Sequence, residues 1–190
     1  MLKDLILHNR SYRGYDERYK VDRNLLLELV ELARLTSSAG NVQPLKYFLS
    51  YEDADNQRIY PLLRWSRCTG EKTEGAGLPT AYICMFVDMG LVSVPSAAYV
   101  DAGIAAQTIL LGAVERGLGG CIVTAIDRLR LKRELMIAIG AYEPFMVIAL
   151  GKPYEDIILE ESGYDTVCYA DERGARHVPK RQITDIIIGM

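Results

Sequence analysis

The sequence predicts a protein in which helices cover a β-sheet, and three segments carry this prediction. Residues 80–88 (TAYICMFVD) are apolar on both faces, which is typical of a central strand in a covered sheet. Residues 22–35 (DRNLLLELVELARL) repeat leucine at helical spacing behind Asp22, a residue type that caps helix starts. Residues 101–117 (DAGIAAQTILLGAVERG) are apolar nearly all round, which indicates a helix buried in a core or against another subunit.

The other expected elements follow from the same local patterns. Strands are expected at 47–51, 120–125 and 144–151, and further helices at 53–65 and 127–140. Turn-forming residues mark a break at Pro61, a loop over 68–79 and a helix end at Gly117. After Pro153 the chain is expected to be irregular, except for a regular element at 182–188. No repeat or linker divides the chain, so residues 1–190 are predicted to form one domain.

Composition excludes several classes of function. The chain has 190 residues, of which 49% are hydrophobic and 25% charged, as in ordinary globular proteins. Its net charge of −3 argues against nucleic acid as a main partner. The four cysteines form no Cys-x-x-Cys motif and only two histidines could help them, so no metal site is expected. No secretory signal or membrane-spanning run is recognised, and we expect a cytoplasmic protein without a membrane partner.

Side chains that could carry out catalysis by themselves are not found. The glycines of 117–120 (GLGG) follow a helix and open a strand, which is the reverse of a dinucleotide-binding fingerprint. No serine lies in a Gly-x-Ser-x-Gly motif, His177 is interpreted as structural, and no carboxylate pair stands out. An enzyme with this sequence would therefore depend on a cofactor.

Four segments together suit flavin mononucleotide (FMN). They are NRSYRGY (9–15), SSAGNVQP (37–44), GLGGCIVTA (117–125) and HVPKRQITDII (177–187). The first and last supply cations for a phosphate dianion, the second supplies hydroxyls and carboxamides, and the third supplies closely approaching backbone. The 37–44 loop contains no reactive group, which fits a segment that surrounds a reactive ring.

These motifs, in this order, resemble the FMN-dependent nitroreductase family. An Arg-Ser-x-Arg element at 10–13 and a Ser-x-x-Asn-x-Gln-Pro loop at 38–44 precede AYICMFVD, the 101–122 segment, VIALGKP and VPKRQITDII. The resemblance implies an α+β fold with a mostly antiparallel central sheet covered by helices, and a homodimer with FMN sites at its interface. It also implies hydride transfer from NADH or NADPH through flavin N5 to a nitroaromatic, a quinone or a related small-molecule acceptor, without a catalytic side chain.

The resemblance also assigns the residues of the FMN site. It implies that the phosphate, the ribityl chain and the N1/O2 edge contact Arg10, Ser11 and Arg13. It implies a loop that reaches the flavin of the other subunit, formed by Ser37, Ser38, Ala39 and Asn41. Backbone near the ring is assigned to Ile122, Val123 and Thr124, and further phosphate cations to Lys180 and Arg181, with the choice between these two left open.

Two departures and two alternatives accompany this assignment. Asn9 stands where the family usually has a further arginine, and Leu45 where many members have tryptophan. A flavin-binding carrier or sensor without hydride transfer remains an alternative, as does a reductive dehalogenase or flavin-degrading enzyme of the same fold. The latter would need a lid with polar substrate contacts, and residues 65–80 offer no obvious one.

Overall fold

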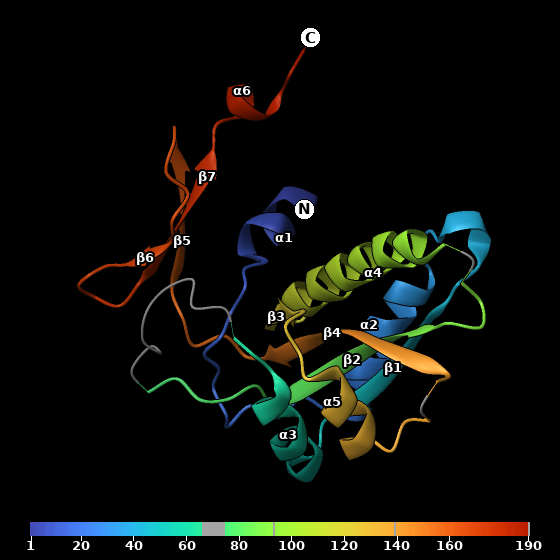
Figure 1. Cartoon of the computed structure of the whole chain (residues 1–190). Helices are drawn as coiled ribbons and strands as arrows, with labels where there is room; N and C mark the ends of the chain where they lie inside the picture. The colour runs from blue at the N-terminus through green and yellow to red at the C-terminus, as the bar shows by residue number, and fades with distance from the viewer. Residues whose placement is uncertain (66–74, 93, 139, 190) are drawn as a thin grey trace.

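The computed structural model describes residues 1–65, 75–92, 94–138 and 140–189 (Figure 1). Its central sheet is antiparallel throughout, with the strand order β1-β2-β4-β3. The strands are β1 (Leu45–Ser50), β2 (Ala81–Asp88), β3 (Gly119–Val123) and β4 (Tyr142–Gly151). Seven of the eight residues of β2 are buried, which confirms its predicted central position. The expected α+β fold with an antiparallel sheet is confirmed.

One face of this sheet is covered by α2 (Arg23–Arg34) and α4 (Pro95–Glu115). The side chain of Asp22 caps α2 as predicted, because it accepts a hydrogen bond of 2.9 Å from the Leu25 backbone N–H. The small residues of α4 allow the two helices to approach closely. A Cβ at Gly112 would lie 2.5 Å from the Leu32 side chain and 3.0 Å from that of Leu29, so these leucines of α2 pack directly against the glycine.

The opposite face is covered by α3 (Asp53–Ile59), the 3-10 turn η2 (Tyr60–Leu62) and α5 (Arg128–Glu134). The helices predicted at 53–65 and 127–140 are therefore both shorter than expected. The first tightens into the 3-10 turn that contains Pro61, which cannot donate a helical hydrogen bond. The second begins behind Asp127 as predicted and has ended before Met136, whose φ of 53° lies in the left-handed region.

A second, smaller sheet corrects the prediction that the chain after Pro153 is irregular. It contains β5 (Ile157–Ser162), β6 (Tyr169–Ala170) and β7 (Arg176–Arg181) in the order β5-β7-β6. The strand β7 was not predicted because its sequence is charged and contains proline, which are not typical of a strand. Pro179 is tolerated because β6 pairs with β7 only at its first two residues and leaves one edge open beyond them. In Figure 1 this sheet lies away from the central sheet, on the same side of the view as α1 (Leu2–His8), and it is followed by α6 (Ile183–Ile186).

The long helix α4 begins earlier than predicted, at Pro95 rather than at 101. It ends as predicted, with Gly117 at a φ of 72° and the Leu118 N–H bonded to the Ala113 carbonyl. By length and composition alone this helix could cross a membrane, which contradicts the expectation that no such run exists. About half of it is instead buried within the domain, where it packs on α2 and the sheet.

Burial of α4 is one-sided within a single chain. Ala102, Ala105 and Ile109 are fully buried, whereas Val100 and Ile104 on the outer face are exposed. The predicted burial on every side therefore holds for the inner face alone in this chain. The loop expected at 68–79 and the segment considered as a lid fall largely on residues 66–74, outside the described residues.

Candidate functional site

The segment that carries the first two predicted arginines docks on β3. The Tyr12 backbone N–H donates to the Gly120 carbonyl at 3.1 Å, and Ser11 pairs with Gly120 as a parallel bridge. Gly119 permits this approach, because a Cβ there would lie 2.3 Å from the Tyr12 ring. Gly120 permits the packing of β3 within the core, because a Cβ there would lie 2.6 Å from the Ala149 carbonyl oxygen. The GLGG turn thus brings the N-terminal segment against the sheet.

Next to this contact lies a pocket of about 220 Å³, which we call the arginine pocket. Its lining comes from the N-terminal segment and from the second sheet. The lining residues are Asn9, Arg10, Ser11, Arg13, Ile157, Cys168, Arg176, Val178 and Lys180. The structure therefore brings together four predicted site residues from the two ends of the chain. Arg181, the alternative to Lys180, is exposed and does not belong to this lining.

The arginines of this pocket have buried N–H groups that lack partners. Within the described residues, no hydrogen bond is made by the buried Nε of Arg10, the buried Nε of Arg13 or the buried Nη1 of Arg176. Other atoms of the side chains are anchored to carbonyls, since Arg10 Nη2 donates to Ile6 and Arg13 Nη1 to Ser11. Partial burial lowers the pKa of Arg10. An anion in this pocket would lie among three guanidinium groups that have unused donors.

Glu155 holds the two sides of the arginine pocket together. Its Oε2 accepts a hydrogen bond of 2.7 Å from the backbone N–H of Arg13, and its Oε1 lies 3.0 Å from Nη2 of Arg176. Both Glu155 and Arg176 are buried. Neither residue is among those predicted from the sequence to form a site. The cluster of cations near the C-terminal end of the sequence could have indicated Arg176 as a site residue. No local sequence feature distinguishes Glu155 from other acidic residues.

The β3 residues assigned to the ring lie at the end of the sheet and alternate in orientation. Val123 is buried in the core, while Ile122 is 37% exposed and Thr124, just beyond the strand, is also exposed. This alternation follows from the two-residue repeat of a strand. The side chain of Val123 therefore packs in the core, and only the backbone of this residue could contact a ligand.

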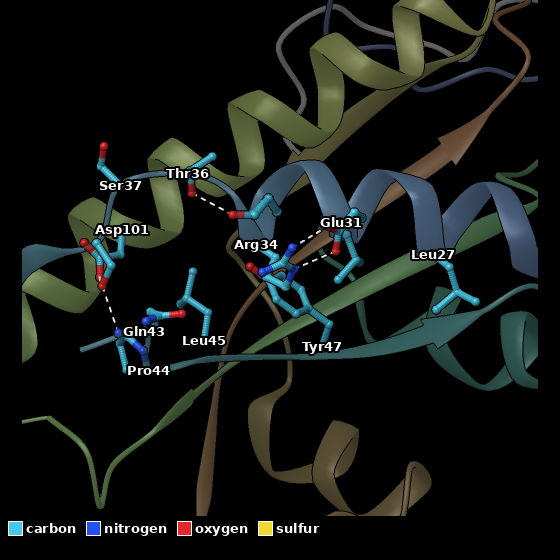
Figure 2. A pocket seen from close by; sticks show the side chains of 13 residues that line it. Leu27, Glu31, Arg34, Thr36, Ser37, Gln43, Pro44, Leu45, Tyr47 and Asp101 are labelled. Atoms are coloured by element: carbon cyan, nitrogen blue, oxygen red, sulfur yellow. Dashed lines mark hydrogen bonds and ion pairs between the residues drawn. The ribbon is translucent and has the colours of Figure 1, made fainter. Parts of the chain in front are cut away.

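The 37–44 loop lies near the N-terminal end of α4, where it borders a pocket of about 350 Å³ (Figure 2). Ser37 and Ser38 belong to this lining, together with Gln43, Pro44 and residues of α2 and β1. Asp101 of α4 accepts hydrogen bonds from the loop, from the Ser38 hydroxyl at 2.6 Å and from the Ala39 N–H at 3.0 Å. Figure 2 shows the Ser37 hydroxyl pointing away from these contacts.

The loop and the arginine pocket occupy opposite ends of α4 in this chain. The loop contacts Asp101, early in the helix, whereas the arginine pocket lies beside β3, which follows the end of the helix. Because α4 has 21 residues, it is about 30 Å long. Ala39 lines a third pocket, of about 170 Å³, and Asn41 is exposed nearby. The other lining residues are Val42, Pro44, Leu91, Val92, Val94, Ala97, Ala98 and Asp101. Within one chain, the predicted site residues of the 37–44 loop therefore lie apart from those of the arginine pocket.

No group of three or more His, Cys, Asp or Glu side chains that could hold a metal ion occurs among the described residues. The charged feature of the site is the arginine pocket, in which Lys180 joins the three guanidinium groups.

Comparison with known proteins identifies relatives by sequence family and by fold. A model of the Nitroreductase family matches residues 6–152. No curated protein matches the sequence. Among solved structures, a candidate nitroreductase from Exiguobacterium sibiricum in complex with FMN is 18% identical, with 100% of this chain and 97% of that chain covered and a TM-score of 0.73.

Two further structures extend the comparison. CLA-ER, an enone reductase of a gut-bacterial fatty acid saturation metabolism, is 17% identical, with 87% and 94% of the two chains covered and a TM-score of 0.70. A candidate NADH oxidase from Clostridium acetobutylicum is 24% identical, with 79% and 87% covered and a TM-score of 0.63. At these identities the likeness establishes a shared fold.

Proposed function

Because the chain belongs to the Nitroreductase family, we propose that it is an FMN-dependent oxidoreductase. It takes hydride from NADH or NADPH and reduces a nitroaromatic, a quinone or a related small-molecule acceptor. The observation that carries this proposal is the set of buried, unpartnered N–H groups on Arg10, Arg13 and Arg176 in one pocket. When bound, the flavin supplies the redox chemistry at its N5 atom, and no catalytic side chain is required.

The arginine pocket fits the phosphate end of FMN. Three guanidinium groups and Lys180 offset the charge of a phosphate dianion even after the single charge of Glu155 is counted. The Ser11 hydroxyl adds a neutral hydrogen-bonding group. Ile122 and Thr124 lie beyond the docked N-terminal segment on the same strand end, where they can flank the ring. The residues of this chain would thus bind and orient the cofactor.

We propose that the rest of the site comes from a second copy of the chain. The 37–44 loop contacts Asp101, and about 20 Å of helix follows before the end of α4 beside which the arginine pocket lies, so completing one site from one subunit is difficult. The outer face of α4 is apolar and exposed at Tyr99, Val100 and Ile104. Burial of this face in a homodimer would remove it from water and bring the loop of one subunit toward the arginine pocket of the other.

We take the protein to be cytoplasmic, without a nucleic-acid or membrane partner. The net charge of −3 disfavours a phosphate backbone as partner. The apolar helix α4 is accounted for by its packing on α2 and the sheet, together with the proposed dimer.

Purified protein tests the proposal. Denaturation is expected to release FMN, identified by chromatography, and anaerobic titration with NADH or NADPH is expected to bleach the flavin absorbance. A nitroaromatic or quinone should then restore it. Release of FAD, or no flavin after reconstitution with FMN, contradicts the cofactor assignment. Bound FMN that neither nicotinamide bleaches would favour the carrier or sensor, and turnover of a haloaromatic instead of these acceptors would favour the dehalogenase.

A further inference from the structure

A buried carboxylate on α4 organises the 37–44 loop. Asp101 is 4% exposed although it lies in a helix whose inner face is otherwise apolar. Its Oδ2 accepts the Ser38 hydroxyl at 2.6 Å and its Oδ1 accepts the Ala39 backbone N–H at 3.0 Å. A buried carboxylate is costly unless it is paired or hydrogen-bonded, and these two donors come from the loop itself. The helix and the loop therefore depend on one another.

The contact with Asp101 extends through the loop as a chain of hydrogen bonds. The Ser38 Oγ donates to Asp101 and accepts from the Gln43 N–H at 2.9 Å. The Gln43 side-chain amide in turn donates to Oδ1 of Asn41 at 3.1 Å. The two N–H groups of the Asn41 carboxamide make no hydrogen bond within the described residues, and they can therefore face a ligand. Figure 2 shows Asp101 and Gln43 close together at one end of the pocket.

The backbone of the loop needs this support. Gly40, Asn41 and Gln43 have φ angles of 58°, 55° and 52°, in the left-handed region that residues with a Cβ rarely adopt. Such conformations persist when surrounding contacts determine them, and they concentrate at ligand-binding segments. In this loop the contacts that do so start at Asp101 and pass through Ser38.

Asp101 makes no ion pair with any of the described residues. Arg34 lines the same pocket, but its guanidinium is paired with Glu31. Burial, and then the charge of Asp101, raises the pKa of Tyr47 to about 12, so this neighbour stays neutral. The carboxylate is thus directed entirely to the loop donors.

We propose that Asp101 is a positioning residue for flavin binding that acts on the site of the partner subunit. It fixes the backbone at Ala39 directly and, through Ser38 and Gln43, the carboxamide of Asn41. The proposed dimer presents both groups to the FMN held by the other subunit's arginine pocket. Asp101 itself does not contact the cofactor. This inference rests on the proposed function, and its test separates the two.

The first experiment measures FMN affinity by titrating apo-protein, with thermal unfolding of each variant measured in parallel. Asp101→Asn keeps the size of the side chain but replaces one acceptor oxygen by a donor. It is expected to weaken FMN binding about ten- to a hundredfold and to change the visible spectrum of the bound flavin. Ser38→Ala, which leaves the Ala39 contact in place, is expected to act in the same direction even if Asp101→Asn does not fold. Asp127→Asn is the matched control, because Asp127 also accepts a backbone N–H, but at the start of α5.

The results separate the inference from the proposed function. Wild-type protein that fails to bind FMN contradicts the proposed function. The inference alone is overturned if the wild-type protein binds FMN and the Asp101→Asn and Ser38→Ala variants bind it as tightly as Asp127→Asn does.

The second experiment tests action across the subunit interface. Arg13→Ala and Asp101→Asn chains carrying different affinity tags are produced together, and the mixed dimer is isolated. One of its two sites then combines an intact arginine pocket with an intact loop, and the other combines both defects. Half of the sites are expected to regain wild-type FMN affinity. If none do, the loop serves the site of its own chain, and the inference is wrong.

Discussion

Glu155 and Arg176 form an ion pair of 3.0 Å in which the two side chains are 3% and 8% exposed. Glu155 also accepts the Arg13 backbone N–H, so this pair connects the N-terminal segment to the second sheet across the arginine pocket. Removing one partner of a buried pair is strongly destabilising, because the other charge is left without compensation. The pocket therefore depends on a carboxylate that repels its proposed ligand.

Glu155→Gln is expected to lower the free energy of unfolding by about 3 kcal/mol, because it leaves the buried guanidinium of Arg176 without its counter-charge. Denaturant unfolding of the variant measures the change. The control is Asp156→Asn at the exposed neighbouring position, for which a change within about 0.5 kcal/mol is expected. Equal stability of the two variants would show that the pair is not important for the fold.

Arg13→Ala is expected to weaken FMN binding far more than Arg18→Ala, although the two residues lie close together in the sequence. Arg13 lines the arginine pocket with a buried, unpartnered Nε, whereas Arg18 is 86% exposed and paired with Asp16. Loss of a charge-assisted hydrogen bond corresponds to about 1.5–3 kcal/mol, or roughly ten- to a hundredfold in affinity. Titration of both apo-variants with FMN gives the comparison, and small, equal effects would contradict the site assignment.

Lys180→Ala is expected to weaken FMN binding, and Arg181→Ala is expected to have little effect. Lys180 belongs to the lining of the arginine pocket and Arg181 does not. Riboflavin, which lacks the phosphate, provides the discriminating ligand. If Lys180 contacts the phosphate, its loss lowers the affinity for FMN and leaves that for riboflavin unchanged. A larger effect of Arg181→Ala would reverse the assignment.

The imidazole of His177 is expected to make the stability of the second sheet depend on pH. A hydrogen bond to Glu160 raises the pKa of His177 against the opposing effect of burial, with Asp171 as a second contributor, and the ring stacks on Tyr169. The folded-state pKa is above the unfolded value of about 6.5. The stabilisation is therefore complete below that value and is lost as pH rises through the folded-state pKa.

Melting temperatures of wild type and His177→Gln test this dependence between pH 6 and pH 9. The gap between them is expected to be largest at the acidic end and to narrow as pH rises. His8→Gln, which removes an exposed imidazole from α1, controls for the general effect of the substitution. A gap that stays constant, or widens, with rising pH would contradict the assigned role of His177.

Ile104→Glu is expected to convert the proposed dimer to monomer without unfolding it. Ile104 lies on the exposed outer face of α4, so the charge is tolerated in a monomer but not in a buried interface. Sedimentation at low micromolar protein measures the assembly state, and Leu129→Glu at an exposed position of α5 is the control. Dimers of Ile104→Glu would place the interface elsewhere. Ala105→Glu is expected instead to unfold the chain, since Ala105 is fully buried in its core.

Elements with local sequence signals could be predicted before the structure was known. The uniform burial of β2 follows from its unbroken apolar run, the start of α2 from Asp22, and the end of α4 from Gly117. Each depends on a residue type and its immediate neighbours. The order of the motifs likewise identified the family, which the match over residues 6–152 confirms.

Contacts between polar groups far apart in the sequence could be seen only in the folded chain. Arg13 and Glu155 are 142 positions apart, and Ser38 and Asp101 are 63 apart. No periodicity in the sequence links such pairs, because their contact depends on how β3, the second sheet and α4 are placed around the core. The strand β7 was not predicted from the sequence for the same reason. Its conformation comes from pairing with β5 rather than from the strand propensity of its own charged residues. Local patterns therefore specified the scaffold, and long-range packing selected Arg176, Glu155 and Asp101 from many similar charged residues.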